Sequence, residues 1–146
     1  MWKFQAKYEY GEISLHDCHI TSIAESNGDI ILNFEDGYWI NQTNPQNPYG
    51  KVLRTDASRL VLVGGSCKDV IFNGKKFSWD EFCSKINSGK WNFECITECY
   101  TDTKIVYHGW VWERKRSHQP DPECQIWLTY QSLTYNWNKI REDRQW

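Results

Sequence analysis

The chain has 146 residues, of which 17 are Lys or Arg and 19 are Asp or Glu, giving a formal net charge of −2. No run of about 18 apolar residues is present, which excludes a hydrophobic membrane-spanning helix. The near-neutral charge provides no basic footprint for nucleic acid, so nucleic acid is not an expected partner. The opening residues lack the apolar run of a secretory leader, and we therefore expect one cytoplasmic domain over residues 1–146, without a membrane partner.

The first 50 residues have the pattern of strands joined by tight turns. Apolar and polar residues alternate over 2–10, which predicts a half-buried strand. Asn27-Gly28 and Asp36-Gly37 are strong signals for two-residue hairpin turns. Together they predict a β-meander over residues 15–41. The following segment, 41–50, is rich in Asn and Pro and is expected to be an irregular loop.

The middle of the chain contains the one helix that the sequence predicts. Short strands are expected over 59–63 and 70–72, where apolar and β-branched residues are concentrated. The period of the apolar residues then changes. Ser78 precedes Glu81 by three residues, as in a capping box, and the apolar residues that follow recur with helical spacing. This pattern predicts a short helix at about 79–88.

The last third of the chain returns to strand patterns. Long alternating segments predict strands over 91–100 and 104–113, and shorter ones over 124–130 and 133–137. A polar loop with a basic run, 114–123, separates the two pairs. The charged tail after residue 139 is expected to be a frayed end or a short helix. These elements predict a mainly β (α+β) fold, namely an antiparallel β-barrel or sandwich with one short helix.

The six cysteines raise the question of disulfide bonds. A cytoplasmic chain keeps its thiols reduced, and the cysteines lie within apolar runs, where a free Cys acts as a small hydrophobic residue. Cys95 and Cys99 are about 13 Å apart along a strand, which is beyond the reach of a disulfide. We therefore expect buried free thiols.

The segment His16-Asp17-Cys18-His19 is the densest cluster of possible metal ligands. On a strand, His16 and Cys18 would share one face, and the other two residues would share the opposite face. A zinc site needs at least three ligands, so a third group such as His108 or Cys124 would have to approach. Nothing in the spacing predicts that approach, and we expect neither a metal site nor a cofactor.

The sequence gives little support for catalytic activity. Glu94 and Glu98 are candidates for a carboxylate pair, but on a strand their backbones lie about 13 Å apart. Glycoside hydrolysis uses carboxyl groups roughly 5–9.5 Å apart. Neither a nucleophile elbow nor a glycine-rich phosphate loop is present. We expect no catalytic residues and no enzyme activity; chemistry at His16, Asp17 or His108 is the least favoured alternative.

Two strand faces carry the best functional clues. Glu94, Glu98 and Tyr100 share one predicted face, where acidic and aromatic groups in a row would suit a basic partner. Trp110 and Trp112 share a face of the next predicted strand. Either the helix or a loop covers this face, or it is an exposed aromatic patch, which marks an interaction site. These five residues form the predicted partner-binding set. In the alternative interpretation, Trp110, Trp112 and Trp127 line the cavity of a ligand-binding β-barrel.

Three short segments resemble those of small bacterial β-proteins without an assigned activity. The segments are Leu15–Ile20, Glu35–Ile40 and Thr134–Trp137. Proteins of this size and type include immunity proteins, which neutralise a toxin made by the same or a neighbouring cell. The resemblance implies a protein partner and assigns no binding residue. The leading hypothesis is therefore a cytosolic protein-binding module, in its specific form an immunity-type protein that occludes the active site of a partner toxin.

Overall fold

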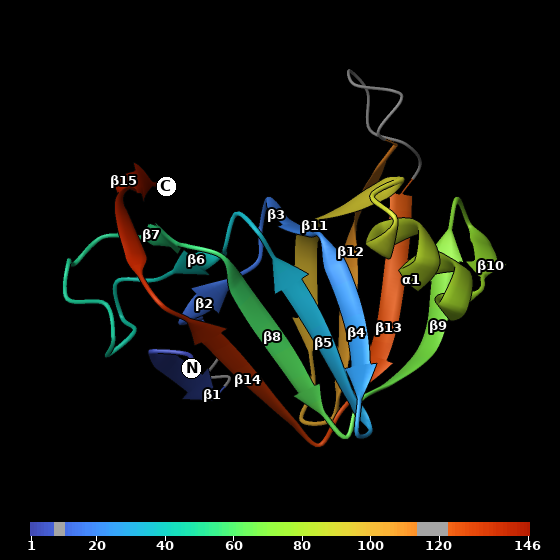
Figure 1. Cartoon of the computed structure of the whole chain (residues 1–146), viewed down its shortest axis with the longest axis horizontal. Helices are drawn as coiled ribbons and strands as arrows, with labels where there is room; N and C mark the ends of the chain where they lie inside the picture. Colours follow the sequence, from blue (N-terminus) through green and yellow to red (C-terminus); the bar gives the residue numbers. More distant parts are fainter. Residues whose placement is uncertain (8–10, 114–122) are drawn as a thin grey trace.

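The computed structural model describes residues 1–7, 11–113 and 123–146, which form antiparallel β-sheets and one short helix (Figure 1). The predicted mainly β class is confirmed. In this described part of the chain the strands form three sheets, and none of them closes into a barrel. The end of the predicted strand 2–10 and nearly all of the predicted loop 114–123, with its basic run, lie outside the described residues.

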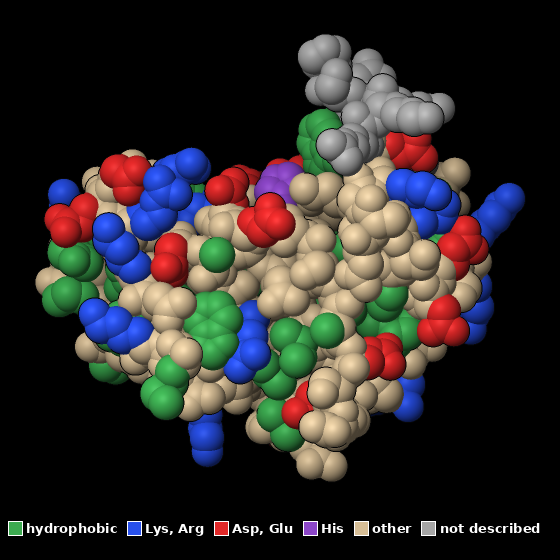
Figure 2. All heavy atoms as spheres, viewed as in Figure 1, with side chains coloured by type: hydrophobic (Ala, Val, Ile, Leu, Met, Phe, Trp, Pro, Cys, Tyr) green, Lys and Arg blue, Asp and Glu red, His purple; other side chains and the backbone are tan. Residues whose placement is uncertain are grey.

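The first sheet has five strands in the order β1-β14-β8-β5-β4. Their bounds are Phe4–Lys7 for β1, Ser132–Trp137 for β14, Ser58–Val63 for β8, Asp29–Phe34 for β5 and Ser22–Ser26 for β4. Side chains alternate along these strands, so Leu60 and Leu62 are buried whereas Val61 between them faces outward. Figure 2 shows this outer face, on which hydrophobic side chains lie among charged ones.

The second sheet has six strands in the order β10-β9-β13-β12-β11-β3 and lies behind the first in Figure 1. Their bounds are Lys75–Phe77 for β10, Ser66–Phe72 for β9, Glu123–Thr129 for β13, Lys104–Glu113 for β12, Trp91–Tyr100 for β11 and Cys18–Ile20 for β3. The inward side chains of both sheets belong to one buried cluster. Its largest fully buried members include Trp137, Tyr107 and Phe93.

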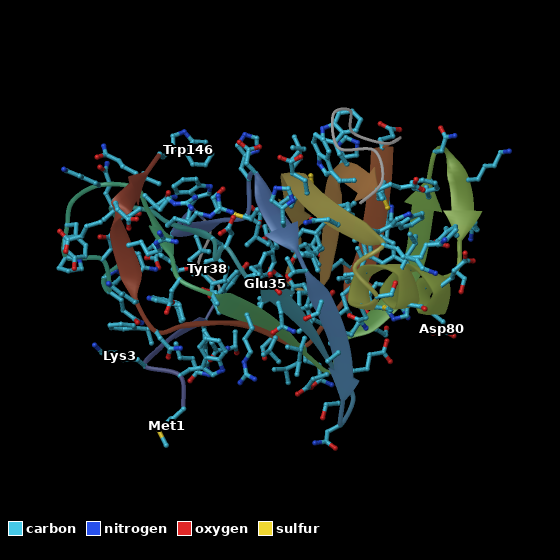
Figure 3. All side chains as sticks on the ribbon, turned by 45° about the horizontal axis from the view of Figure 1, so that its top comes forward. Met1, Lys3, Glu35, Tyr38, Asp80 and Trp146 are labelled. Carbon is cyan, nitrogen blue, oxygen red and sulfur yellow. The ribbon has the colours of Figure 1, made fainter. Side chains whose placement is uncertain are left out.

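A third sheet of four short strands extends the core at one end of the molecule, in the order β15-β7-β6-β2. The bounds are Ile140–Gln145 for β15, Leu53–Thr55 for β7, Trp39–Ile40 for β6 and Ile13–Ser14 for β2. Tyr38, just before β6, is fully buried, and its hydroxyl donates to the carbonyl of Asn136 over 3.1 Å. In Figure 3, Trp146 after β15 and Asp80 on the helix lie at opposite ends of the molecule.

This third sheet corrects two predictions. The turn at Asp36-Gly37 does not fold β6 back onto β5, because β6 pairs with β2 and β7 instead. Gly37 has φ of +73°, and a Cβ there would overlap the backbone carbonyl of Thr55, so the chain leaves the first sheet at a point that only glycine fits. The tail is not frayed or helical, since β15 pairs with β7.

The single helix of the described chain, α1, spans Trp79–Asn87 and confirms the predicted helix. The side chain of Ser78 accepts the backbone N–H of Glu81 over 3.3 Å, as the capping box predicts. Phe82 is fully buried and meets the ring of Phe93 edge-on at 6.2 Å between centroids. The helix therefore covers the core at the end opposite the third sheet (Figure 1). No helix in the described part is long and apolar enough to cross a membrane.

Candidate functional site

The outer face of the six-stranded sheet gathers aromatic, imidazole and carboxylate side chains. On β12, Tyr107 and Val111 are fully buried, so Trp110 and Trp112 project from the opposite face. On β13 the flanking residues are buried in the same way, and Trp127 is 44% exposed. We call this surface the tryptophan face. Its residues are His19, Asn92, Glu94, His108, Trp110, Trp112, Glu123, Gln125 and Trp127.

The strand register arranges this face in rows that cross the sheet. Trp110 lies directly opposite Glu94 on β11 and directly opposite Glu123 on β13. Glu94 in turn lies opposite His19 on β3. Across β3, β11, β12 and β13, the side chains therefore lie in the order His19, Glu94, Trp110 and Glu123. We call this set the Trp110 row. An indole stands between two carboxylates in this row.

Hydrogen bonds hold one side of the Trp110 row in place. The indole N–H of Trp112 donates to Oε2 of Glu94 over 2.6 Å. Nδ1 of His19 lies 2.8 Å from Oδ1 of Asn92, and its Nε2 lies 3.9 Å from Oε1 of Glu94. The side chain of Glu94 is only 17% exposed. The carboxylate is therefore fixed between an indole and an imidazole before any partner arrives.

The other side of the row is held by a second histidine. Nε2 of His108 lies 3.2 Å from Oε2 of Glu123, and the His108 ring lies 6.4 Å from that of Trp110. Further along β13, the indole N–H of Trp127 donates to Gln125 over 3.3 Å. The Glu123 side chain is 53% exposed. The face thus presents a held carboxylate and an accessible one on either side of Trp110.

A β-bulge in β11 decides which predicted residues reach this face. Cys95 pairs with Gly109 and Thr97 with His108, so Ile96 has no partner residue on β12. One extra residue reverses the facing of every side chain that follows it. Glu98 therefore lies opposite the buried Tyr107, and Tyr100 lies opposite Ile105, on the core side.

The predicted shared face of Glu94 and Glu98 is thus wrong. The carboxylate of Glu98 is buried, accepts the backbone N–H of Leu15 over 2.7 Å, and accepts the hydroxyl of Tyr100. Burial raises the pKa of Glu98 above its ordinary value. The hydroxyl of Tyr100 also lies 3.2 Å from that of Tyr135, so these groups form an interior network. Of the five predicted binding residues, only Glu94, Trp110 and Trp112 come together.

The three tryptophans of the alternative ligand-binding interpretation do not face the interior. Trp110, Trp112 and Trp127 all project from the outer side of the six-stranded sheet, opposite the buried side chains of their own strands. The described strands also form no closed barrel that could hold a cavity between them. A barrel cavity lined by these indoles is therefore not part of the described structure.

The histidine cluster at residues 16–19 lies on a turn rather than along one strand. The N–H of Cys18 donates to the carbonyl of Leu15, and Asp17 has a positive φ of 56°. Nδ1 of His16 lies 2.9 Å from the carbonyl oxygen of Ile96, and the His16 ring stacks on Trp146. Among the described residues, no three His, Cys, Asp or Glu side chains are placed to hold a metal ion.

All six cysteines are free thiols. Cys18, Cys95 and Cys124 are buried, as predicted, whereas Cys67 and Cys83 are only half-buried. Cys99 is exposed on the side of β11 that faces outward after the bulge. Burial raises the pKa of Cys18 to about 12 and that of Cys124 to about 12. These interior thiols are therefore protonated at neutral pH and suited to packing rather than to nucleophilic chemistry.

Comparison of the chain with protein-family models, with curated proteins and with solved structures found no match. The tryptophan face is therefore the candidate functional site on the grounds of its geometry alone. Alternation along 104–113 places His108 on the same face as Trp110 and Trp112, but the sequence did not point to His19 or Glu123 as part of that face. Each comes from a strand whose register with its neighbour cannot be read from local alternation, although Gly109, an isolated glycine inside a strand, is a signal for the bulge.

Proposed function

We propose that the chain is a cytosolic protein-binding module that recognises a basic partner surface through its tryptophan face. Its scaffold is a sandwich-like packing of two antiparallel sheets. The observation that carries the proposal is the Trp110 row, in which Glu94 and Glu123 flank an indole on a sheet face directed outward. Trp is among the residues most enriched at the energetic centres of protein interfaces.

The charge around Trp110 favours a cationic partner. Both carboxylates of the row face outward, and within the described residues neither forms an ion pair with a lysine or an arginine. Lys76 is paired with Asp69 at 2.7 Å, and Lys104 lies about 20 Å from Trp110 along β12. Charge complementarity steers the encounter of partners and fixes their register, so a basic surface with room for an indole fits this face.

The face has the rigidity that an occluding inhibitor needs. All of its side chains except that of His19 stand on the central strands β11, β12 and β13, and a hydrogen bond joins Trp112 to Glu94. A preorganised surface loses little entropy on binding. In the specific form of the proposal, the partner is a toxin and the tryptophan face covers its active site, so the chain acts as an immunity-type protein without catalysis of its own.

Site-specific photo-crosslinking in the cells that produce the protein tests this proposal. A benzophenone amino acid replaces Trp127, which is 44% exposed on the face, or Tyr49, which is 41% exposed in the loop before β7. We expect the Trp127 position to give one dominant protein adduct in good yield and the Tyr49 position to give none, because only the first lies on the docking surface.

Purification of the adduct and identification of the attached peptide complete the measurement. The crosslinked peptide is expected to come from a basic surface of the partner. Equal labelling at the two positions, or no protein adduct at Trp127, would contradict the proposed binding role of the face.

A further inference from the structure

We infer that the group of the partner that anchors it to the tryptophan face is an arginine side chain, lying on the ring of Trp110 between Glu94 and Glu123. This inference rests on the proposed function and specifies the chemistry of the partner. It follows from the spacing of the Trp110 row, from the unused oxygens of its carboxylates, and from the way in which the protein packs its own arginines.

The spacing of the row suits a planar cation. Neighbouring strands lie about 4.8 Å apart, so the backbones of Glu94 and Glu123 are separated by about 10 Å with Trp110 midway. A guanidinium group can stack on an indole while its edge donates in the same plane to acceptors on either side. Both carboxylates can therefore reach one guanidinium that lies over Trp110.

Each carboxylate keeps one oxygen for such a donor. Oε2 of Glu94 accepts the indole N–H of Trp112, and Oε2 of Glu123 faces His108. Oε1 of Glu94 has only the more distant Nε2 of His19, at 3.9 Å, and Oε1 of Glu123 accepts no hydrogen bond from the described residues. Glu94 and Glu123, which carry these two oxygens, lie on either side of Trp110 in the strand register. Charge-assisted hydrogen bonds to a guanidinium are stronger than neutral ones.

The protein already packs guanidinium groups on indole rings elsewhere. Arg54 lies over Trp39 with 5.0 Å from its guanidinium carbon to the ring centroid, and Arg59 lies over Trp2 at 5.2 Å. Trp110 has no such cation over its ring among the described residues. A lysine fits the row less well, because its compact ammonium group offers no flat surface to stack on the indole and no planar edge with donors directed at acceptors on both sides.

A peptide titration followed by NMR tests the inference on the whole chain. The probes are acetyl-Gly-Arg-Gly-amide, its lysine counterpart, and its citrulline counterpart, which keeps the shape of arginine without the charge. The signal is the indole N–H of Trp110, assigned with the Trp110→Phe variant. We expect the arginine peptide to shift this signal saturably, the lysine peptide to bind about five times more weakly, and the citrulline peptide to cause no shift up to 50 millimolar, roughly the range in which single-anchor contacts are seen.

A pair of charge variants locates the anchor. Glu123→Gln is expected to weaken binding of the arginine peptide about tenfold, because it removes the accessible carboxylate of the row. Asp69→Asn, at a carboxylate of the same sheet that lies outside the Trp110 row and is paired with Lys76, is expected to leave binding unchanged. Equal binding of the arginine and lysine peptides, no shift of the Trp110 signal, or equal effects of the two variants would overturn the inference. If a partner is crosslinked at Trp127 but any of these results is found, the proposed function is retained. Arginine is then rejected as the anchoring group of the partner.

Discussion

Replacing Gly109 with alanine is expected to destabilise the protein by about 3–5 kcal/mol, a large part of the stability of an ordinary domain. A Cβ at Gly109 would overlap the backbone carbonyl oxygen of Glu94, which lies on the neighbouring strand. The obstacle is backbone rather than the end of a flexible side chain, so β11 and β12 would have to separate. Gly109 is paired with Cys95 beside the bulge, and the same separation would break the Trp110 row.

Urea unfolding of Gly109→Ala and of a matched glycine variant provides the measurement. Gly50 is the control because it has a positive φ of 62° but open space around the position of a Cβ. Gly50→Ala should therefore cost only about 1–2 kcal/mol, from backbone strain alone. Similar losses of unfolding free energy in the two variants would contradict the close approach of β11 and β12 at Gly109.

The contribution of Glu98 to the free energy of unfolding is expected to fall as the pH rises. Its pKa is raised in the folded state, chiefly by burial, so the folded state holds this proton more tightly than the unfolded chain does. The resulting stabilisation is greatest at acidic pH. It decreases as the pH rises from the ordinary value of 4.5 through the raised folded value. Glu98→Gln, which removes the titration, should therefore gain stability relative to the wild type across that window.

Glu98→Ala should behave differently from the glutamine variant. It leaves the N–H of Leu15 and the hydroxyl of Tyr100 without their acceptor, and we expect a loss of about 2–4 kcal/mol at neutral pH. Urea unfolding of both variants from pH 5 to pH 8 makes the measurement. Glu35→Gln, at an exposed position, is the control and should change stability by less than about 0.5 kcal/mol. A constant difference between Glu98→Gln and the wild type at every pH would contradict a buried carboxylate.

The parts of the fold that depend on neighbouring residues could be predicted from the sequence. The helix at Trp79–Asn87 and the hairpin at Asn27-Gly28 are specified by capping and turn residues within a few positions of one another. The long strands β11 and β12 also have the predicted bounds. The partner of β6 and the strand character of β15 could not be predicted, because both depend on pairing with distant segments.

The side chains that one strand contributes to the site could be predicted, but their neighbours on adjacent strands could not. Alternation alone places Trp110 and Trp112 on one face of β12, and the structure confirms it. The facing of Glu98 depends on a single unpaired residue, Ile96, whose presence strict alternation cannot reveal. The carboxylate on the far side of Trp110 comes from Glu123, whose position is set by the register of β13 against β12. Such registers are properties of the folded sheet.

The dissociation constant of the crosslinked partner, measured by calorimetry with the purified chain, tests the central claim most directly. Trp110→Ala removes the indole of the row from a sheet face without entering the core, and the variant should fold normally. We expect it to weaken binding by about 30-fold or more, as for a residue at the centre of an interface. Tyr49→Ala, at an exposed site off the face, should bind like the wild type. Binding of Trp110→Ala with wild-type affinity would contradict the assignment of the tryptophan face as the partner-binding surface.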